Sequence, residues 1–146
     1  MEIREEIYTL EFADEVDAVI YENLEENKVV YADTDWKHMT YIREHRAGSL
    51  VVVVARDKGK AVGFLMHWIM QSPNHNVLQA QQAGIVVDKE HRTGFTGLKM
   101  IKKMEKILKK RGVDVMVLGS TPKLDISPLF KRLGFQEAET VYFKEI

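Results

Sequence analysis

The segment from Ile85 to Leu98 holds the residue types and spacing best suited to binding an anion. It joins an apolar stretch typical of a strand to a strongly basic stretch typical of a helix. Glycines let a backbone approach a ligand closely, and the unpaired N–H groups at the start of a helix attract phosphate. We therefore expect an anion site at residues 92–97, and an ordinary strand-to-helix loop is the alternative.

Charge is unevenly distributed along the chain, whose net charge is only −1. Residues 1–27 carry ten acidic side chains against Arg4, whereas residues 89–111 carry nine lysines and arginines against two glutamates. This separation favours an anionic ligand near the basic segment, although two solvated helix faces would give the same pattern. The near-zero net charge argues against a general polyanion binder. Nucleic-acid binding by residues 99–111 is a less favoured alternative, because no aromatic residues are interleaved there.

The elements that would position this segment follow from hydrophobic periodicity and turn residues. Their order predicts an α/β fold of the α+β sandwich type, with a mixed, mostly antiparallel sheet flanked by helices. Thr34 or Asp35 is expected to cap the second helix, and Gly84 to mark a bulge or a close approach within a strand. We expect strands at 3–8, 50–55, 61–70, 77–87, 113–118 and 141–143, and helices at 12–27, 36–47, 98–111 and 125–133.

Composition limits the class of protein. The 146 residues suit a single domain, and the absence of cysteine excludes disulfides, thiolate metal sites and a cysteine nucleophile. The five histidines show no metal-ligand spacing, so no metal is expected. The longest apolar run, from Leu50 to Ala55, is too short to cross a membrane, and the acidic N-terminus is unlike a signal peptide. A soluble, cytoplasmic protein is the expectation.

Three motifs resemble the GNAT superfamily of acyl-CoA-dependent N-acyltransferases, and small phage-encoded members in particular. A strand ends in Ile85-Val-Val-Asp88, Arg92-Thr-Gly-Phe-Thr-Gly97 opens a helix, and a later helix ends in Phe130-Lys-Arg-Leu-Gly-Phe135. The similarity covers about residues 50–143. It implies a GNAT-like fold that binds acetyl-CoA or another acyl-CoA as co-substrate.

The resemblance also implies roles for individual residues. The backbone of Ile85, Val86 and Val87 would pair with the pantetheine arm, and an N–H near Val86 or Val87 would polarise the thioester carbonyl. Lysines and arginines around the basic helix would meet the 3′-phosphate of the adenosine, and Lys123 occupies the place of an asparagine that is frequent in the family. The pyrophosphate would be held by the N–H groups of Arg92, Thr93, Gly94, Phe95, Thr96 and Gly97.

Besides Lys123, three positions depart from the family pattern. Phe95 stands where the family has the middle glycine of the phosphate loop. Phe130 stands where many members have a tyrosine that protonates the leaving thiolate, and Gln81 where many have a carboxylate that acts as general base. Neither Phe130 nor Gln81 can exchange a proton at neutral pH. Three explanations are open. Other side chains could act as the general acid and base, with His67 and Ser127 as the catalytic candidates, or the positioning of the two reactants and polarisation of the carbonyl could be enough for catalysis. Alternatively, the fold could be kept for binding alone.

The resulting hypothesis is an N-acyltransferase that moves an acetyl group from acetyl-CoA to a primary amine by direct attack. The alternative is a catalytically silent CoA-binding or protein-interaction module of the same fold. Within the single domain, residues 1–48 would supply the acceptor-side helices and residues 49–146 the sheet and the acyl-CoA-binding core. The amine acceptor is not indicated, and a homodimer would suit a small sheet that must cover an edge.

Overall fold

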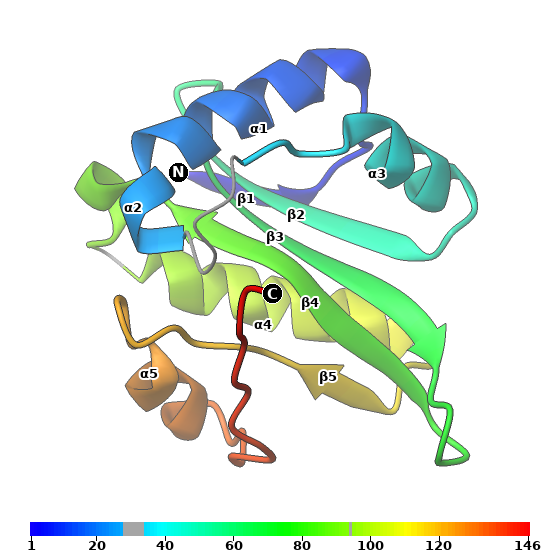
Figure 1. The fold of residues 1–146 in the computed structure, drawn as a ribbon. Coiled ribbons are helices and arrows are strands. Elements are labelled where there is room, and N and C mark those ends of the chain that lie inside the picture. Colours follow the sequence, from blue (N-terminus) through cyan, green and yellow to red (C-terminus); the bar gives the residue numbers. More distant parts are fainter. Residues whose placement is uncertain (28–33, 94) are drawn as a thin grey trace.

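The computed structural model describes residues 1–27, 34–93 and 95–146. Five strands and five α-helices, with one short 3₁₀ turn, follow each other along these residues (Figure 1). The strands are β1 (Glu2–Glu5), β2 (Leu50–Asp57), β3 (Lys60–Gln71), β4 (Leu78–Val87) and β5 (Val115–Val117). The helices are α1 (Leu10–Glu22), α2 (Leu24–Asn27), α3 (His38–Arg46), α4 (Thr96–Lys110) and α5 (Ser127–Arg132), with the 3₁₀ turn η1 (Lys89–His91) before α4.

The five strands form one sheet in the order β1-β2-β3-β4-β5. Neighbours from β1 to β4 are antiparallel, and β4 pairs with β5 in parallel. The predicted mixed, mostly antiparallel sheet is therefore confirmed. The β2–β3 hairpin turns on Lys58 and Gly59, whose φ angles of 50° and 83° both lie in the left-handed region that tight hairpins require.

Helices cover both faces of the sheet: α1 and α3 lie on one side, and α4 and α5 on the other (Figure 1). The continuous apolar run of β2 serves both layers, because side chains alternate along a strand. Val52 and Val54 pack with α1 and α3, whereas Val51 and Val53 pack with α4 and α5. Helix α4 turns an apolar stripe toward the sheet: Ile101, Met104 and Leu108 are buried in it together with Met100, and Leu98 and Ile107 are half-buried.

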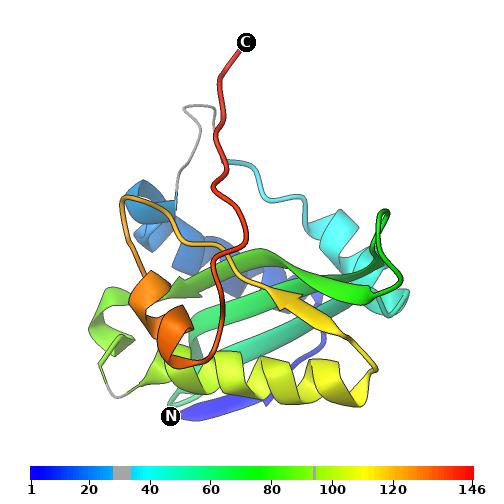
Figure 2. The same cartoon turned by 90° about the horizontal axis from the view of Figure 1, so that it is seen from below.

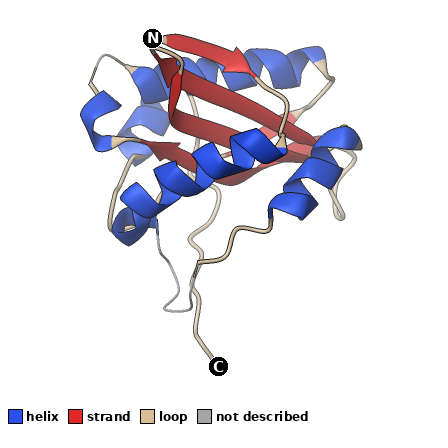
Figure 3. Cartoon of the chain, turned by 90° about the horizontal axis from the view of Figure 1, so that it is seen from above, coloured by secondary structure: helices blue, strands red, loops and turns tan. Residues whose placement is uncertain are grey.

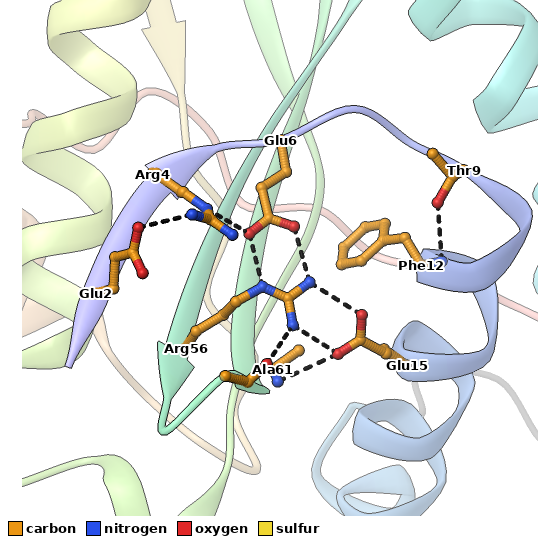
Figure 4. Close-up of polar contacts among 9 residues, drawn as sticks. Glu2, Arg4, Glu6, Thr9, Phe12, Glu15, Arg56 and Ala61 are labelled. Carbon is orange, nitrogen blue, oxygen red and sulfur yellow. Dashed lines mark hydrogen bonds and ion pairs between the residues drawn. The ribbon is translucent and has the colours of Figure 1, made fainter.

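A network of polar contacts fixes the first strand and the first helix to the sheet (Figure 4). The guanidinium of Arg56 donates to both carboxylate oxygens of Glu6 at 2.7 and 2.8 Å and to both of Glu15 at 2.7 and 2.9 Å. Burial would raise the pKa of Glu6, but hydrogen bonds from Arg56 and Arg4 outweigh it and hold that pKa below its usual value. The hydrogen bonds of Arg56 likewise lower the pKa of Glu15.

The predicted start of the second helix is wrong. Helix α3 begins at His38, and its N-cap is Lys37, which makes no side-chain cap bond, so neither Thr34 nor Asp35 caps it. Trp36, which the periodicity assigned to this helix, lies before it and stacks on Tyr41 with ring centroids 4.9 Å apart. The ring is thus held by aromatic packing instead of by a helical turn.

The predicted last strand at Val141–Phe143 is also wrong. No secondary structure follows Gly134, and the C-terminal segment projects away from the sheet (Figures 2 and 3). The side chains of Val141 and Tyr142 are 79% and 87% exposed. β-branched and aromatic residues favour a strand only where a neighbouring strand pairs with them, and no strand of the described residues pairs with this segment.

Candidate functional site

An open strand edge lies where β4 and β5 separate. Their parallel pairing covers only Gln79–Gln81 against Val115–Val117, and β4 continues as far as Val87. Among the described residues, the β5-facing edge of residues 82–87 therefore has no strand partner. Figure 1 shows the two strands diverging toward the start of α4. An extended ligand could pair with this edge as an additional strand.

A β-bulge shapes β4 at the point of separation. Met66 pairs with Gly84 and His67 with Gln82, so that Ala83 is an extra residue on β4. A Cβ added to Gly84 would lie 3.0 Å from Cη2 of Trp36, so only glycine fits beneath this ring without displacing it. The predicted bulge at Gly84 is confirmed, and the close neighbour is an aromatic side chain of the chain itself.

Side chains hold β5 at the same point. His67 Nε2 hydrogen-bonds the Val117 carbonyl at 3.0 Å, and the Gly119 N–H donates to Oε1 of Gln82 at 2.8 Å. His67 is fully buried, and burial lowers its pKa to about 4, which keeps the imidazole neutral at pH 7. A neutral ring with Nε2 protonated donates to the carbonyl and keeps the strands at a fixed separation.

The loop before α4 is tied to the end of α1. Arg92 Nε donates to the Val87 carbonyl at 2.9 Å, and Nη2 donates to Oδ1 of Asn23 at 3.3 Å. The buried Asn23 in turn donates to the carbonyl of Val19 at 2.9 Å and to Oδ1 of Asp88 at 3.4 Å. These bonds fix the direction in which the loop leaves β4.

The start of α4 is well suited to an anion. Its N-cap, Phe95, provides no side-chain cap, and the first turn contains no acidic residue. Phe95 has a φ of 69°, in the left-handed region where a glycine is common, and its ring is 67% exposed. Thr93 is exposed and Thr96 buried, whereas Gly94 lies outside the described residues. The N–H groups of the first turn, together with the helix dipole, favour negative charge here.

Helix α5 lies beside the start of α4. A Cβ added to Gly97 would lie 3.7 Å from Cδ2 of Leu129, an ordinary contact distance. Ser127, the first residue of α5, donates its N–H to Oδ1 of Asp125 at 2.9 Å. The hydrogen bonds from Ser127 and Ser120 lower the pKa of Asp125.

The other predicted positions near α5 differ in exposure. Phe130 is buried, with its ring centroid 5.9 Å from that of Phe135, so it belongs to the core. Lys123 is exposed in the preceding turn. The structure thus brings α5 beside the first turn of α4, where Gly97 lies, and it places His67 within the core instead of on a surface.

On the opposite face, aromatic rings form a wall above the bulge. Tyr41 stacks on Trp36 with ring centroids 4.9 Å apart, and its ring lies tilted against that of Trp68 with centroids 4.8 Å apart. Beside this wall, the hydroxyl of Tyr8 shares a 2.7 Å hydrogen bond with Nδ1 of His38, whose Nε2 lies 2.8 Å from Oδ1 of Asp17. These side chains all come from the first 48 residues, except Trp68 of β3.

Sequence reasoning missed the residues that shape the opening. Neither Asn23 nor Gln82 belongs to a recognisable motif, and no motif indicated that His67 would bind the Val117 carbonyl. The only signal was a polar residue in an otherwise apolar strand, which predicts that the side chain has a hydrogen-bond partner but not which one.

Comparison with known proteins places the sequence in a family. The family model described as acetyltransferase (GNAT) domain matches residues 48–137. No curated protein sequence matches significantly. Within the described residues, no helix is both long enough and apolar enough to cross a membrane.

Solved structures share the fold at low identity. An aminoglycoside acetyltransferase from an uncultured soil metagenomic sample, in complex with sisomicin, has 16% identity and a TM-score of 0.78, covering 99% of this chain and 95% of its own. A predicted acetyltransferase from Clostridium acetobutylicum with acetyl-CoA has 14% identity and a TM-score of 0.78, with the same coverage. A ribosomal-protein-alanine N-acetyltransferase from Brucella melitensis biovar Abortus 2308 has 14% identity and a TM-score of 0.72, with both chains covered completely.

Proposed function

Since the chain belongs to the acetyltransferase (GNAT) family, we propose that it transfers an acetyl group from acetyl-CoA to a primary amine by direct attack. The observation that carries the proposal is the continuous path from the open edge of β4 to the uncapped start of α4. This path combines backbone N–H and C=O groups of a strand edge without a strand partner, which can pair with an extended arm, with a helix N-terminus, which can bind a pyrophosphate.

The chain's own groups fit acyl-CoA along this path. The backbone of Ile85, Val86 and Val87 lies on the open edge and would pair with the pantetheine arm. Arg92 and its neighbours up to Gly97 would surround the pyrophosphate, with Gly94 in the part of this loop outside the described residues. Lys123 and the exposed lysines of α4 would meet the 3′-phosphate of the adenosine.

The proposed reaction needs little from titratable side chains. The amine nitrogen forms a bond to the thioester carbon, the carbon–sulfur bond breaks, and CoA leaves as a thiolate while the nitrogen loses a proton to water. An N–H near Val86 or Val87 would stabilise the negative oxygen of the intermediate. Holding the two reactants together can contribute roughly 7–11 kcal/mol. Ser127 at the start of α5 remains a candidate acid, whereas His67 would need to release the Val117 carbonyl to act as a base.

The acceptor would enter from the side of residues 1–48, with residues 49–146 providing the acyl-CoA core and the strands β2 to β5. Trp36, Tyr41 and Trp68 line this side of β4, and the acidic α1 lies next to them. Aromatic faces and carboxylates both attract a cationic amine. The printed names of the structural relatives include acceptors as different as an aminoglycoside and a ribosomal-protein alanine, so the fold alone selects none.

The test is release of CoA from acetyl-CoA in the presence of a panel of amines, followed with a thiol reagent. The chain contains no cysteine, so the reagent reports only the released CoA. We expect at least one primary amine to raise release well above the rate of hydrolysis without amine. A panel that never exceeds hydrolysis, although acetyl-CoA binds, would contradict transfer.

The second candidate is a catalytically silent module that binds CoA or a protein. The observation that favours it is the lack of an accessible proton carrier at the usual places. Phe130 is buried in the core, Gln81 does not titrate, and His67 is buried with Nε2 engaged. The same panel separates the two functions, because the silent module binds acetyl-CoA without turnover.

A further inference from the structure

A side-chain bridge closes the narrow end of the gap between β4 and β5. The two strands pair in parallel as far as Gln81 and Val117, and they separate beyond these residues. Gln82 is the first residue of β4 past the last pair, and its Oε1 accepts the N–H of Gly119, just after β5, at 2.8 Å. The carboxamide of Gln82 therefore spans the gap where it begins, and the gap widens from there toward the start of α4 (Figure 1).

The bridge lies on the α4 side of the sheet. Gln82 is the cross-strand partner of His67, and His67 is in turn the partner of Val51. Residues paired in this way share a face of the sheet, and Val51 belongs to the core beneath α4 and α5. On the same face, Nε2 of the fully buried His67 hydrogen-bonds the Val117 carbonyl at 3.0 Å. Two side chains thus hold the end of β5 to the sheet at the narrow end of the gap.

The direction of the proposed acyl-CoA path decides which part of the ligand meets this bridge, so the inference rests on the proposed function. The pyrophosphate would bind at the start of α4, beyond the Val87 end of β4, and the pantetheine arm would run back along the edge toward Ile85. The acyl group is at the opposite end of the arm from the pyrophosphate, so it points toward Gln82. Only Ala83 and Gly84, where β4 bulges, separate Ile85 from Gln82.

We propose that the carboxamide of Gln82, held by Gly119, is the end wall of the acyl site and restricts the donor to short acyl chains. A chain longer than acetyl by two methylenes would have to displace the carboxamide and break its hydrogen bond to the Gly119 N–H. The wall faces α4, whereas the acceptor would enter over the opposite face, beside Trp36 and Tyr41. Gln82 therefore selects the acyl donor and leaves the choice of amine to other residues.

The test is calorimetric titration of acetyl-CoA and butyryl-CoA into the full chain, without an amine. The quantity compared is the ratio of the two dissociation constants, which cancels effects common to both ligands. The wild type should bind acetyl-CoA more tightly. In Gln82→Ala the preference for butyryl-CoA over acetyl-CoA should rise by about ten-fold, because a methylene that becomes buried strengthens binding by about four-fold. Gln82→Asn, shorter by one methylene, should shift the ratio by about four-fold and serves where the alanine variant does not fold.

Two matched variants should keep the wild-type ratio. Gln82→Glu has the same length and keeps an oxygen that accepts the Gly119 N–H. Gln79→Ala removes the same side chain from the part of β4 that β5 covers, where Gln79 pairs with Val115.

The same titrations separate failure of the end wall from failure of the proposed function. If both ligands bind and the ratio is the same in wild type, Gln82→Ala and Gln82→Asn, the end wall is refuted and the acyl-CoA path stands. A wild type that prefers butyryl-CoA refutes the end wall as well. If neither ligand binds the folded wild type, the path itself is contradicted, and the end wall with it.

Discussion

Replacing Gly97 by aspartate should separate acyl-CoA binding from folding. Gly97 is the second residue of α4, at the start of which the pyrophosphate is proposed to bind. An added Cβ there would lie 3.7 Å from Leu129, so the site tolerates a side chain. A carboxylate in the first turn also complements the helix dipole, by about 0.3–1 kcal/mol. The thermal stability of the variant should therefore equal or exceed that of the wild type.

Binding should respond in the opposite direction. Two unit charges about 4 Å apart repel by roughly 1 kcal/mol in water and roughly 4 kcal/mol near a protein surface. Since about 1.4 kcal/mol corresponds to a factor of ten, a single carboxylate–phosphate contact should weaken acetyl-CoA binding by roughly five-fold to seven-hundred-fold.

The assay is calorimetric titration of acetyl-CoA into wild type, Gly97→Asp and the matched control Gly97→Ala. The alanine variant adds the same Cβ without charge and should bind within about three-fold of the wild type. Unchanged affinity in the aspartate variant would show that the pyrophosphate does not lie at the start of α4. Equal losses in both variants would show that shape, and not charge, was responsible.

Three further predictions concern stability. His67 has a pKa of about 4 in the folded chain and about 6.5 in the unfolded chain, so the unfolded chain binds more protons between these pH values. As the pH falls from 6.5 to 4, the wild type should therefore lose up to about 3 kcal/mol of unfolding free energy relative to His67→Gln. Denaturant titrations at each pH measure this difference. Arg56→Met should lower the free energy of unfolding by about 3 kcal/mol, far more than Arg43→Met at an exposed site. Its deficit should shrink below about pH 4.5, where the carboxylates of Glu6 and Glu15, whose pKa values are lowered in the folded state, become protonated; a pH-independent deficit would contradict the charge network. Phe95→Gly should raise the free energy of unfolding by about 1 kcal/mol, because φ is 69° and the ring is exposed, and a lower melting temperature would refute this strain.

Most of the sheet and the main helices could be predicted from the sequence because local signals agree with tertiary packing there. The apolar stripe of α4, the glycine-containing turn after Asp57 and the bulge at Gly84 each follow from periodicity or from the properties of glycine. The motifs around Arg92 and Phe130 indicated the fold, which the family match confirms. In the structure, the first motif leads into α4 and the second lies at the end of α5.

The errors occurred where structure depends on distant partners. Trp36 has a helical spacing but is held by Tyr41 and by the bare backbone of Gly84, contacts that no local pattern records. Val141–Phe143 has the composition of a strand, yet strand formation requires an edge to pair with. The hydrogen bonds of His67 with Val117 of β5 and of Gln82 with Gly119, just after β5, join residues 50 and 37 positions apart, so only the folded chain could reveal them.

The measurement that tests the central claim most directly is the calorimetric titration of acetyl-CoA into the wild-type protein, with CoA as the comparison ligand. Binding of both in the micromolar range would support the path from the open edge of β4 to the start of α4. No heat of binding for either ligand, in a sample whose circular dichroism shows it to be folded, would contradict it. The left-handed Phe95 in place of a glycine would then be the first residue to examine.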